Sequence, residues 1–181
     1  MGCDIHVVAE VRSGDKWSLS DIEIPHGRDY NSFAILANVR NGYGFAGCDT
    51  GDELQFISLP RGLPVDLSFE LNDKLQNEKE TDFFWLGDHS FSWVTLQEML
   101  DYPYAGEIVT RGLVTAEQAK KYKLTGEAPK TWCGWTNIIG YESIEWERPM
   151  KEAAWLFGEI IEKISPIGEP ENVRIVFGFD S

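Results

Sequence analysis

The sequence predicts an α+β fold made of a single domain over residues 1–181. The expected sheet is mixed or antiparallel, is formed by the N- and C-terminal strands, and carries helices packed on one face. Strand patterns stand at both ends of the chain, over residues 1–12 and 173–180, and helical patterns with capping signals lie between them. No internal repeat, low-complexity tract or Pro- or Ser-rich linker divides the 181 residues, which suffice for one domain with a buried core.

The first dozen residues alternate with the period of a β-strand. One face takes Cys3, Ile5, Val7, Ala9 and Val11, and the other takes Asp4, His6, Val8, Glu10 and Arg12. Because side chains at positions i and i+2 of a strand project in parallel, Asp4 and His6 can converge on one ligand. We therefore expect a polar site around this strand. The closing strand is expected to pair near it, which would bring Asp180 to the same end of the sheet.

Local signals predict a hairpin and a short helix after the first strand. Residues 13–15 (Ser-Gly-Asp) are typical of a hairpin turn, so residues 16–24 are expected to form the partner strand. Residues 33–39 have apolar side chains at helical spacing, with Asn31 or Ser32 as the expected N-cap.

Capping signals predict the remaining helices. The glycine-rich residues 41–52 lack the motif of a phosphate-binding P-loop and are expected to form a loop. Asp66 is the expected cap of a helix that ends near residue 78, and capping boxes at Thr95 and Thr115 predict two more. Residues 142–147 alternate like a strand, and the helix with the clearest apolar face is expected to run from Pro149 to about residue 164.

The composition excludes several classes of protein. A hydrophobic fraction of 43% excludes a disordered chain, and a net charge of −14 opposes binding to a polynucleotide or an anionic membrane. Three cysteines without a C-x-x-C pair fit reduced thiols, and no signal peptide or membrane span is expected, so we predict a cytoplasmic location. A small phosphorylated ligand is compatible with this charge if arginine or a metal supplies local positive charge. The sequence leaves open a homo-oligomer.

Four residues supply nitrogen and oxygen ligands that suit a divalent metal. Asp4 and His6 lie on the first strand, and Asp88 and His89 lie at a turn after an apolar run. A metal held by them would activate bound water and offset the acidic surface for a phosphate-bearing substrate. The spacings match no complete metal motif. The alternative is that both histidines are partly buried and hydrogen-bonded to nearby carboxylates.

The same residues allow catalysis without a metal. Either histidine can act as a general base oriented by the aspartate near it in sequence, so the expected catalytic residues are His6, His89 and Asp4. Ser90 or Ser92 is the candidate nucleophile. Adjacency in sequence does not establish such a group, because a catalytic triad is recognised by its arrangement in space.

Arginine and aromatic residues are the candidates for binding a ligand. Arg61 can clamp an anion because its guanidinium binds phosphate bidentately. Tryptophan can stack on a nucleobase, an interaction worth about 1–3 kcal/mol per base. The expected ligand-binding residues are Arg61, Ser90, Trp93, Trp132 and Trp135. The alternatives are a salt bridge to a carboxylate for any arginine, including Arg111 and Arg148, and packing of the Trp132–Trp135 loop onto the core.

Four segments resemble a family of uncharacterised bacteriophage and prophage proteins. They are Met1-Gly-Cys-Asp-Ile-His6, Pro60-Arg-Gly-Leu-Pro64, Gly87-Asp-His-Ser-Phe-Ser-Trp93 and Val173-Arg-Ile-Val-Phe-Gly-Phe-Asp180. The resemblance spans most of the chain and implies a viral accessory protein that works in the host bacterial cytoplasm. It brings no established activity to these residues. Phe91 stands where a further histidine is expected, which weakens the case for a histidine-rich metal site.

These features lead to one expected function and two alternatives. The first is a phage accessory protein that counters host defence by metal- or His-assisted hydrolysis of a nucleotide-like or phosphorylated ligand. Its small-molecule site is expected to be lined by Asp4, His6, Arg61, His89 and Trp93. The second is a non-catalytic sponge that sequesters a nucleotide immune signal. The third is an acidic protein inhibitor of a host enzyme.

Overall fold

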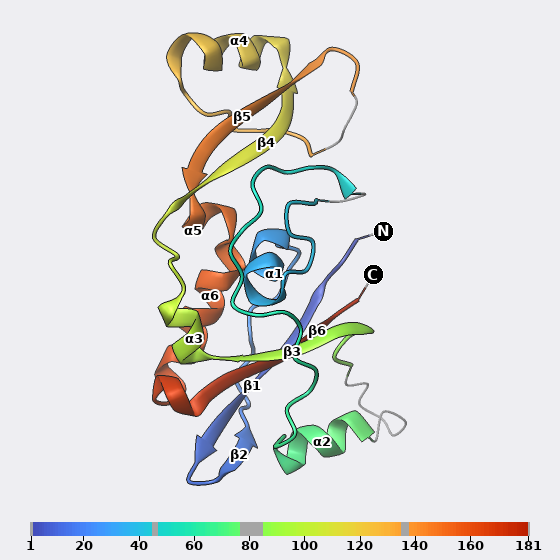
Figure 1. Cartoon of the computed structure of the whole chain (residues 1–181), viewed down its shortest axis with the longest axis vertical. Helices are drawn as coiled ribbons and strands as arrows, with labels where there is room; N and C mark the ends of the chain where they lie inside the picture. Colours follow the sequence, from blue (N-terminus) through green and yellow to red (C-terminus); the bar gives the residue numbers. More distant parts are fainter. Residues whose placement is uncertain (1, 45–46, 77–84, 135–137, 181) are drawn as a thin grey trace.

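The computed structural model describes residues 2–44, 47–76, 85–134 and 138–180 (Figure 1). Its main sheet is antiparallel, in the strand order β2 (Lys16–Leu19), β1 (Ile5–Ser13), β6 (Val173–Phe179) and β3 (His89–Thr95). Ile5 lies opposite Phe179, so the start of β1 and the end of β6 are neighbours. The predicted α+β class and the pairing of the two terminal strands are confirmed.

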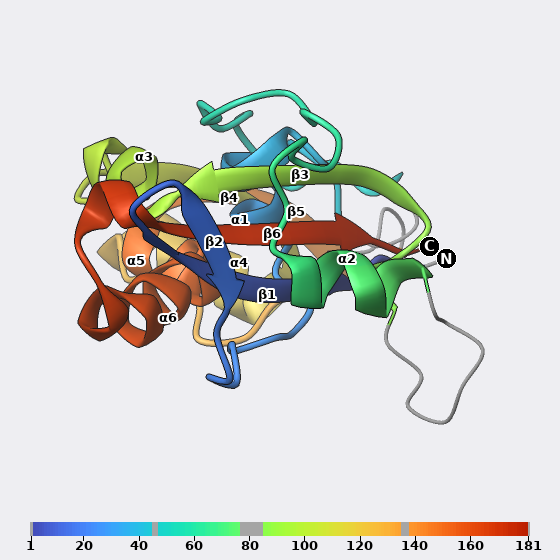
Figure 2. The ribbon, with the colours of Figure 1, turned by 90° about the horizontal axis from the view of Figure 1, so that it is seen from below.

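Helices cover the sheet and build the core with it. The inner face of the sheet is covered by α1 (Tyr30–Ala37), α3 (Leu96–Asp101) and α6 (Trp155–Ile164), and the outer face is partly covered by α2 (Phe69–Gln76) (Figure 2). On the inner face, Ala9 and Phe177 are fully buried with Phe33 of α1 and Phe157 of α6. No helix in the described ranges is long and apolar enough for a membrane crossing.

A second, two-stranded sheet stands at one end of the molecule (Figure 1). It consists of β4 (Glu107–Thr115) and β5 (Tyr141–Pro149), and α4 (Ala116–Thr125) follows β4 directly. Ile108 of β4 belongs to the main hydrophobic core, which joins the two sheets in one compact domain. β4 is not predicted from the sequence, because Ile108 and Val109 are both apolar and Gly112 interrupts the alternation.

Local capping signals fix two helices, and tertiary packing alters another. The capping boxes at Thr95 and Thr115 are confirmed, and they begin α3 and α4. The single helix expected from Pro149 is interrupted at Ala154, whose φ of −122° is not helical. A short helix, α5 (Met150–Ala153), therefore precedes α6.

A buried aspartate begins two helices. The N-cap of α1 is Asp29, rather than the expected Asn31 or Ser32. Its carboxylate accepts hydrogen bonds from the N–H of Ser32 (3.3 Å) and from the N–H of Leu156 in the first turn of α6 (3.0 Å). Burial raises the pKa of Asp29 above its ordinary value of 3.8, although these hydrogen bonds act in the opposite direction. The link to α6 could not be predicted from a local pattern, because Leu156 lies 127 residues from Asp29.

Two other element ends differ from the prediction. β2 ends at Leu19 instead of residue 24. Asp66 does not cap α2, which begins at Phe69, and Ser68 Oγ instead accepts a hydrogen bond from the N–H of Leu71. Asp66 is drawn to the outer face of the main sheet.

A buried arginine organises that outer face. The guanidinium carbon of Arg174 lies 3.9 Å from the ring centroid of Trp17 and 5.7 Å from that of Trp93. Its Nε donates a hydrogen bond of 2.8 Å to Oε2 of Glu10, the residue opposite it in β1. Glu10 is 0% exposed and Arg174 is 2% exposed, so the ion pair is shielded from water.

Two more arginines extend this stack. The guanidinium carbon of Arg12 lies 5.4 Å from the first tryptophan ring, and that of Arg61 lies 4.9 Å from the second. We call this set the arginine–tryptophan ladder: Arg12, Trp17, Arg174, Trp93 and Arg61. Asp66 accepts hydrogen bonds from the central arginine and from the first tryptophan, so the ladder holds the segment before α2 against the sheet.

The chain crosses the outer face very close to β6. A Cβ atom at Gly178 would lie 2.2 Å from the carbonyl oxygen of Leu86, so only glycine lets the Leu86 backbone pass. The crossing places Trp85 beside His6 of β1, with ring centroids 4.7 Å apart. It thereby forms one wall of the first candidate site.

Candidate functional site

His6 lies in a cleft beside the first half of β1. β2 pairs with β1 only over Glu10 to Ser13, so residues 5–8 of β1 border a cleft of about 440 Å³. The rest of this histidine cleft is lined by Asp4, Ile24, His26, Gly27, Trp85 and Leu86. Two of the chain's three histidines therefore face the same space.

Asp180 orients His6, and its predicted position at this end of the sheet is confirmed. Nε2 of His6 lies 3.2 Å from Oδ2 of Asp180. Partial burial raises the pKa of Asp180, but hydrogen bonds from the Asp4 N–H and from His6 outweigh it and bring the pKa below 3.8. The ionised carboxylate accepts a hydrogen bond at neutral pH, so we assign the Nε2–H tautomer to His6. Nδ1 then carries the basic lone pair.

Asp4 lines the same cleft, but its carboxylate is bound by an arginine. Nε of Arg28 lies 2.9 Å from Oδ1 of Asp4, and Nη2 lies 2.5 Å from Oδ2. Asp4 and His6, which the sequence places side by side, therefore bind different partners, Arg28 and Asp180. Asp4 holds the loop after β2, and Asp180 takes the place expected for Asp4 beside His6.

The four expected metal ligands are not brought together. His6 lies opposite Gly178, on the outer face, whereas the His89 ring stacks on Phe179, which belongs to the inner-face core, with ring centroids 6.1 Å apart. Asp88 is exposed, and its N–H donates to the carbonyl of Phe179. In the described part of the chain, no three His, Cys, Asp or Glu side chains form a group able to hold a metal. The prediction fails because the two histidines lie on opposite faces of the sheet.

The candidate serines have separate surroundings. Nδ1 of His89 lies 2.9 Å from Oγ of Ser90, at an irregularity in the pairing of β3 where Ser90 has a positive φ of 53°. Ser92 is fully buried, and its Oγ accepts a hydrogen bond from the N–H of Arg61. Ser92 is therefore a structural residue, and only Ser90 has a histidine beside it.

Arg61 and Trp93 do not line the histidine cleft. Both belong to the arginine–tryptophan ladder near the end of β3, whereas the cleft lies beside the end of β6 that faces the start of β3. Arg61 forms a salt bridge of 2.6 Å with Glu98, which is the alternative that the sequence analysis left open. The single site expected from five residues is therefore not assembled.

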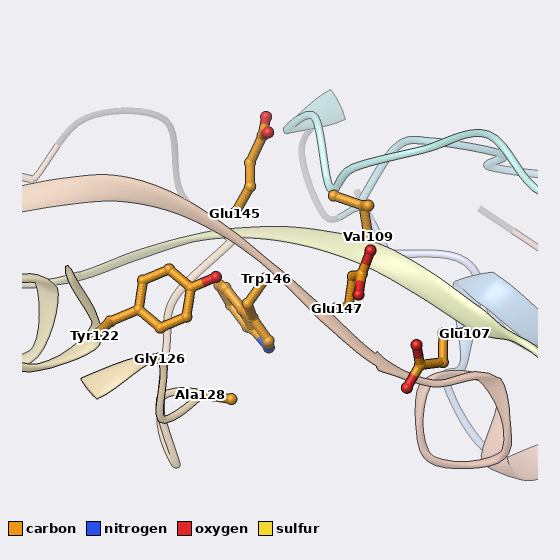
Figure 3. A pocket seen from close by; sticks show the side chains of 8 residues that line it. All are labelled: Glu107, Val109, Tyr122, Gly126, Ala128, Glu145, Trp146 and Glu147. Atoms are coloured by element: carbon orange, nitrogen blue, oxygen red, sulfur yellow. The ribbon is translucent and has the colours of Figure 1, made fainter. Parts of the chain in front are cut away.

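An acidic groove of about 470 Å³ lies beside β5. Figure 3 shows Tyr122 and Trp146 lying side by side, with the carboxylates of Glu107 and Glu147 beyond them and Glu145 pointing away. Glu145 forms a salt bridge with an arginine, so two carboxylates remain to set the charge of the groove. Like charges repel, so this groove does not suit a phosphorylated ligand.

A third space, which we call the arginine cavity, has the opposite character. It has a volume of about 390 Å³ and lies where the Arg28–Asn31 segment and α5 meet the two-stranded sheet. Its charged side chains and tryptophans are Arg28, Arg111, Arg148, Asp29, Glu152, Trp132 and Trp155. Three of the 16 basic residues of an acidic chain thus line one cavity.

Arg148 is the cation of this cavity that forms no salt bridge with any described residue. Its Nε donates a hydrogen bond of 2.9 Å to Oγ1 of Thr110, and its guanidinium carbon lies 5.0 Å from the Trp132 ring centroid. Within the described residues, neither of its Nη groups has a hydrogen-bond acceptor, and no carboxylate lies within 4.0 Å of it. Burial lowers the pKa of the Arg148 guanidinium, and attraction by the Asp29 and Glu152 carboxylates, which line the same cavity, acts in the opposite direction without outweighing it.

The other two arginines are partly or fully used by the protein. Arg111 forms salt bridges with Asp49 and Glu145, which is the structural alternative to ligand binding that the sequence left open for it. Arg28 donates Nε and Nη2 to Asp4, and its Nη1 has no acceptor among the described residues. Arg148 and Nη1 of Arg28 therefore remain as donors for an anion in the cavity.

Tryptophan rings provide flat apolar surface in the same cavity. Trp132 and Trp155 are 40% and 41% exposed, in contrast to Trp146, which is 3% exposed. Trp132 packs on Gly112, where a Cβ atom would lie 2.6 Å from its ring, and this contact holds the ring in place. The predicted ligand-binding Trp132 is thus at a cavity, whereas Trp135 lies outside the described residues.

Sequence reasoning missed Arg28, Arg148 and Trp155 as site residues. From composition alone, Arg148 is not selected as a ligand-binding residue, because 30 acidic residues make a salt bridge the expected contact of any arginine. Comparison of the chain with protein-family models, curated proteins and solved structures gave no match. The function is therefore argued from the geometry of the two spaces.

Proposed function

We propose that this protein captures a small nucleotide-like ligand, which combines phosphate with an aromatic ring, in the arginine cavity. The observation that carries the proposal is Arg148, whose charge is half-buried and lacks a carboxylate partner among the described residues. A phosphate offers oxygen acceptors to both Nη groups, and such charge-assisted bidentate contacts are the strong form of hydrogen bond.

The surroundings support the same class of ligand. The exposed faces of Trp132 and Trp155 can stack on an aromatic ring. A volume of about 390 Å³ falls within the range of small-molecule pockets. The local arginines also reconcile an anionic ligand with a net charge of −14.

The resemblance to phage proteins supplies a biological setting for this proposal. Capture of a phosphorylated signal of host defence in the bacterial cytoplasm would lower its free concentration without any chemistry. We therefore favour, as the basic activity, the sequestration of such a nucleotide over the inhibition of a host enzyme. The acidic groove is a surface that an inhibitor of a host enzyme could use, but no feature of it identifies a partner.

The test is isothermal titration calorimetry with nucleoside diphosphates of the four common bases. The Arg148→Met variant removes the charge and keeps the stem of the side chain. We expect loss of about 1.5–3 kcal/mol of binding free energy, or roughly a 10- to 150-fold weaker Kd. Lys123→Met is the matched control, since it makes the same charge change at an exposed salt bridge with Glu142. Equal binding by Arg148→Met and the wild type would contradict the proposal, as would no binding of any of the four by the wild type.

A further inference from the structure

The histidine cleft and the arginine cavity are separated by one loop. Gly27 and His26 line the histidine cleft, and Arg28 lines the arginine cavity. Trp155 of the cavity packs so closely on Gly27 that a Cβ atom there would lie 3.0 Å from its ring. The Asp4 carboxylate of the cleft binds the Arg28 guanidinium of the cavity across the same loop. The two spaces are therefore immediate neighbours.

We propose that His6 is the general base of a hydrolytic activity that cleaves a phosphoester bond of the captured ligand. This inference rests on the proposed function, because the arginine cavity anchors the ligand. Arg148 and Arg28 line the same cavity, and Nη1 of Arg28 has no acceptor among the described residues, so a phosphate bound to Arg28 would lie at the boundary of the two spaces. A phosphodiester anchored there can extend past Arg28 toward His6.

The hydrogen bond between His6 and Asp180 is the arrangement that such a base needs. Asp180 fixes the Nε2–H tautomer, and the Trp85 ring beside the imidazole limits its rotation. Nδ1 of His6 has no hydrogen-bond donor or acceptor among the described residues, so it can accept a proton from water in the cleft. Asp180 is a positioning residue, since it acts through His6 and stabilises the imidazolium that forms.

The step balances with water as the only co-reactant. Nδ1 of His6 removes a proton from water, and the water oxygen forms a bond to phosphorus. The bond between phosphorus and the ester oxygen breaks, and the ester oxygen leaves with the bonding electron pair. The ester oxygen takes up a proton from solvent water, and the His6 imidazolium returns its proton to solvent. The products are a phosphomonoester and an alcohol.

His89 offers a matched control because its ring packs on the inner-face residue Phe179. The probe is bis(p-nitrophenyl) phosphate, an anionic phosphodiester with aromatic rings, and the signal is release of p-nitrophenolate. We expect wild-type turnover that His6→Ala lowers by about 100-fold or more, the usual range for general acid–base catalysis. His89→Asn is expected to retain wild-type turnover, and added imidazole is expected to restore part of the activity of His6→Ala.

Asp180→Asn tests the positioning role separately. It is expected to lower kcat with little change in the KM for the probe, because Asp180 orients His6 and does not line the arginine cavity. An unchanged kcat would overturn the role of Asp180. Wild-type protein that binds the probe but releases no nitrophenolate would overturn the hydrolytic activity and leave capture intact. Wild-type protein that neither binds nor cleaves the probe contradicts both proposals, and undiminished turnover by His6→Ala excludes His6 as the base.

Discussion

The replacement of Arg174 by Met tests how the outer face of the sheet is stabilised. Arg174 and Glu10 are both buried, and their ion pair is the central contact of the arginine–tryptophan ladder. Loss of the arginine leaves the Glu10 carboxylate in a dry environment, where its remaining hydrogen bond comes from the N–H of Ser68. Removal of one partner from a buried ion pair destabilises a protein by about 3–5 kcal/mol.

The other contacts of Arg174 change this magnitude little. Asp66 is 61% exposed on its side chain, so its salt bridge with Arg174 contributes about 0–1 kcal/mol. The cation–π contact with Trp17 at 3.9 Å is desolvated and can contribute about 2 kcal/mol, part of which the Met side chain replaces by packing. We therefore expect Arg174→Met to lower the free energy of unfolding by about 5 kcal/mol. The double variant Arg174→Met/Glu10→Gln, which also removes the buried negative charge, is expected to lose less.

Urea unfolding followed by tryptophan fluorescence measures this difference. Arg61→Met is the control within the same ladder, because its salt bridge with Glu98 is partly exposed and its loss is expected to destabilise by about 1–2 kcal/mol. A loss below 1 kcal/mol for Arg174→Met, or a loss equal to that of Arg61→Met, would refute the reasoning. The double variant must also be more stable than Arg174→Met alone.

Two further predictions concern close packing and pH. Gly178→Ala is expected to destabilise the fold by about 3 kcal/mol or more, because its Cβ atom would lie 2.2 Å from the Leu86 carbonyl oxygen. Gly106→Ala is the control, since its Cβ atom would meet nothing closer than 3.9 Å. Comparable urea midpoints for the two variants would contradict this prediction. For Glu98, burial raises the pKa, but hydrogen bonds from Arg61 and Thr95 outweigh it, so the folded pKa lies below 4.5. The folded chain therefore binds this proton more weakly than the unfolded chain. Its stabilising contribution is present above pH 4.5 and is lost as the pH falls through the folded pKa. Arg61→Met should flatten the acid dependence of the urea midpoint, and an unchanged slope would exclude this account.

The terminal strands and the capped helices were accessible to sequence analysis because their signals are local. The alternation of residues 1–12 predicts β1, and the pairing of β1 with β6 follows from two strands at the ends of an α+β chain. Thr95 and Thr115 begin helices through contacts with residues three positions away. Such short-range contacts do not depend on the rest of the fold.

Long-range contacts account for what the sequence did not reveal. Glu10 alternates onto a face expected to be polar, yet it is fully buried because Arg174, 164 residues later, lies opposite it. A salt bridge is expected for Arg148, but its hydrogen-bond and ring contacts among the described residues are with Thr110 of β4, a strand that the sequence does not predict, and Trp132. The side chain that carries the proposed function therefore takes its character from contacts that no local pattern contains.

The candidate site was located only in part. The strand with Asp4 and His6 does border a cleft, and Asp180 does reach it, but His89 lies on the inner face of β3 and Arg61 lies in the segment before α2. A one-dimensional pattern gives the face of a residue within its own strand. It does not give the relative faces of His6 and His89, because these depend on how both strands register with β6.

Native mass spectrometry of the protein purified from cells tests the central claim most directly. We expect the wild type to carry a phosphorylated aromatic small molecule, intact or as its hydrolysis products, at up to one copy per chain. Arg148→Met, purified in parallel, is expected to carry none, while the Lys123→Met control is expected to retain it. A wild-type mass equal to that of the bare chain, or equal ligand retention by Arg148→Met, would contradict capture in the arginine cavity.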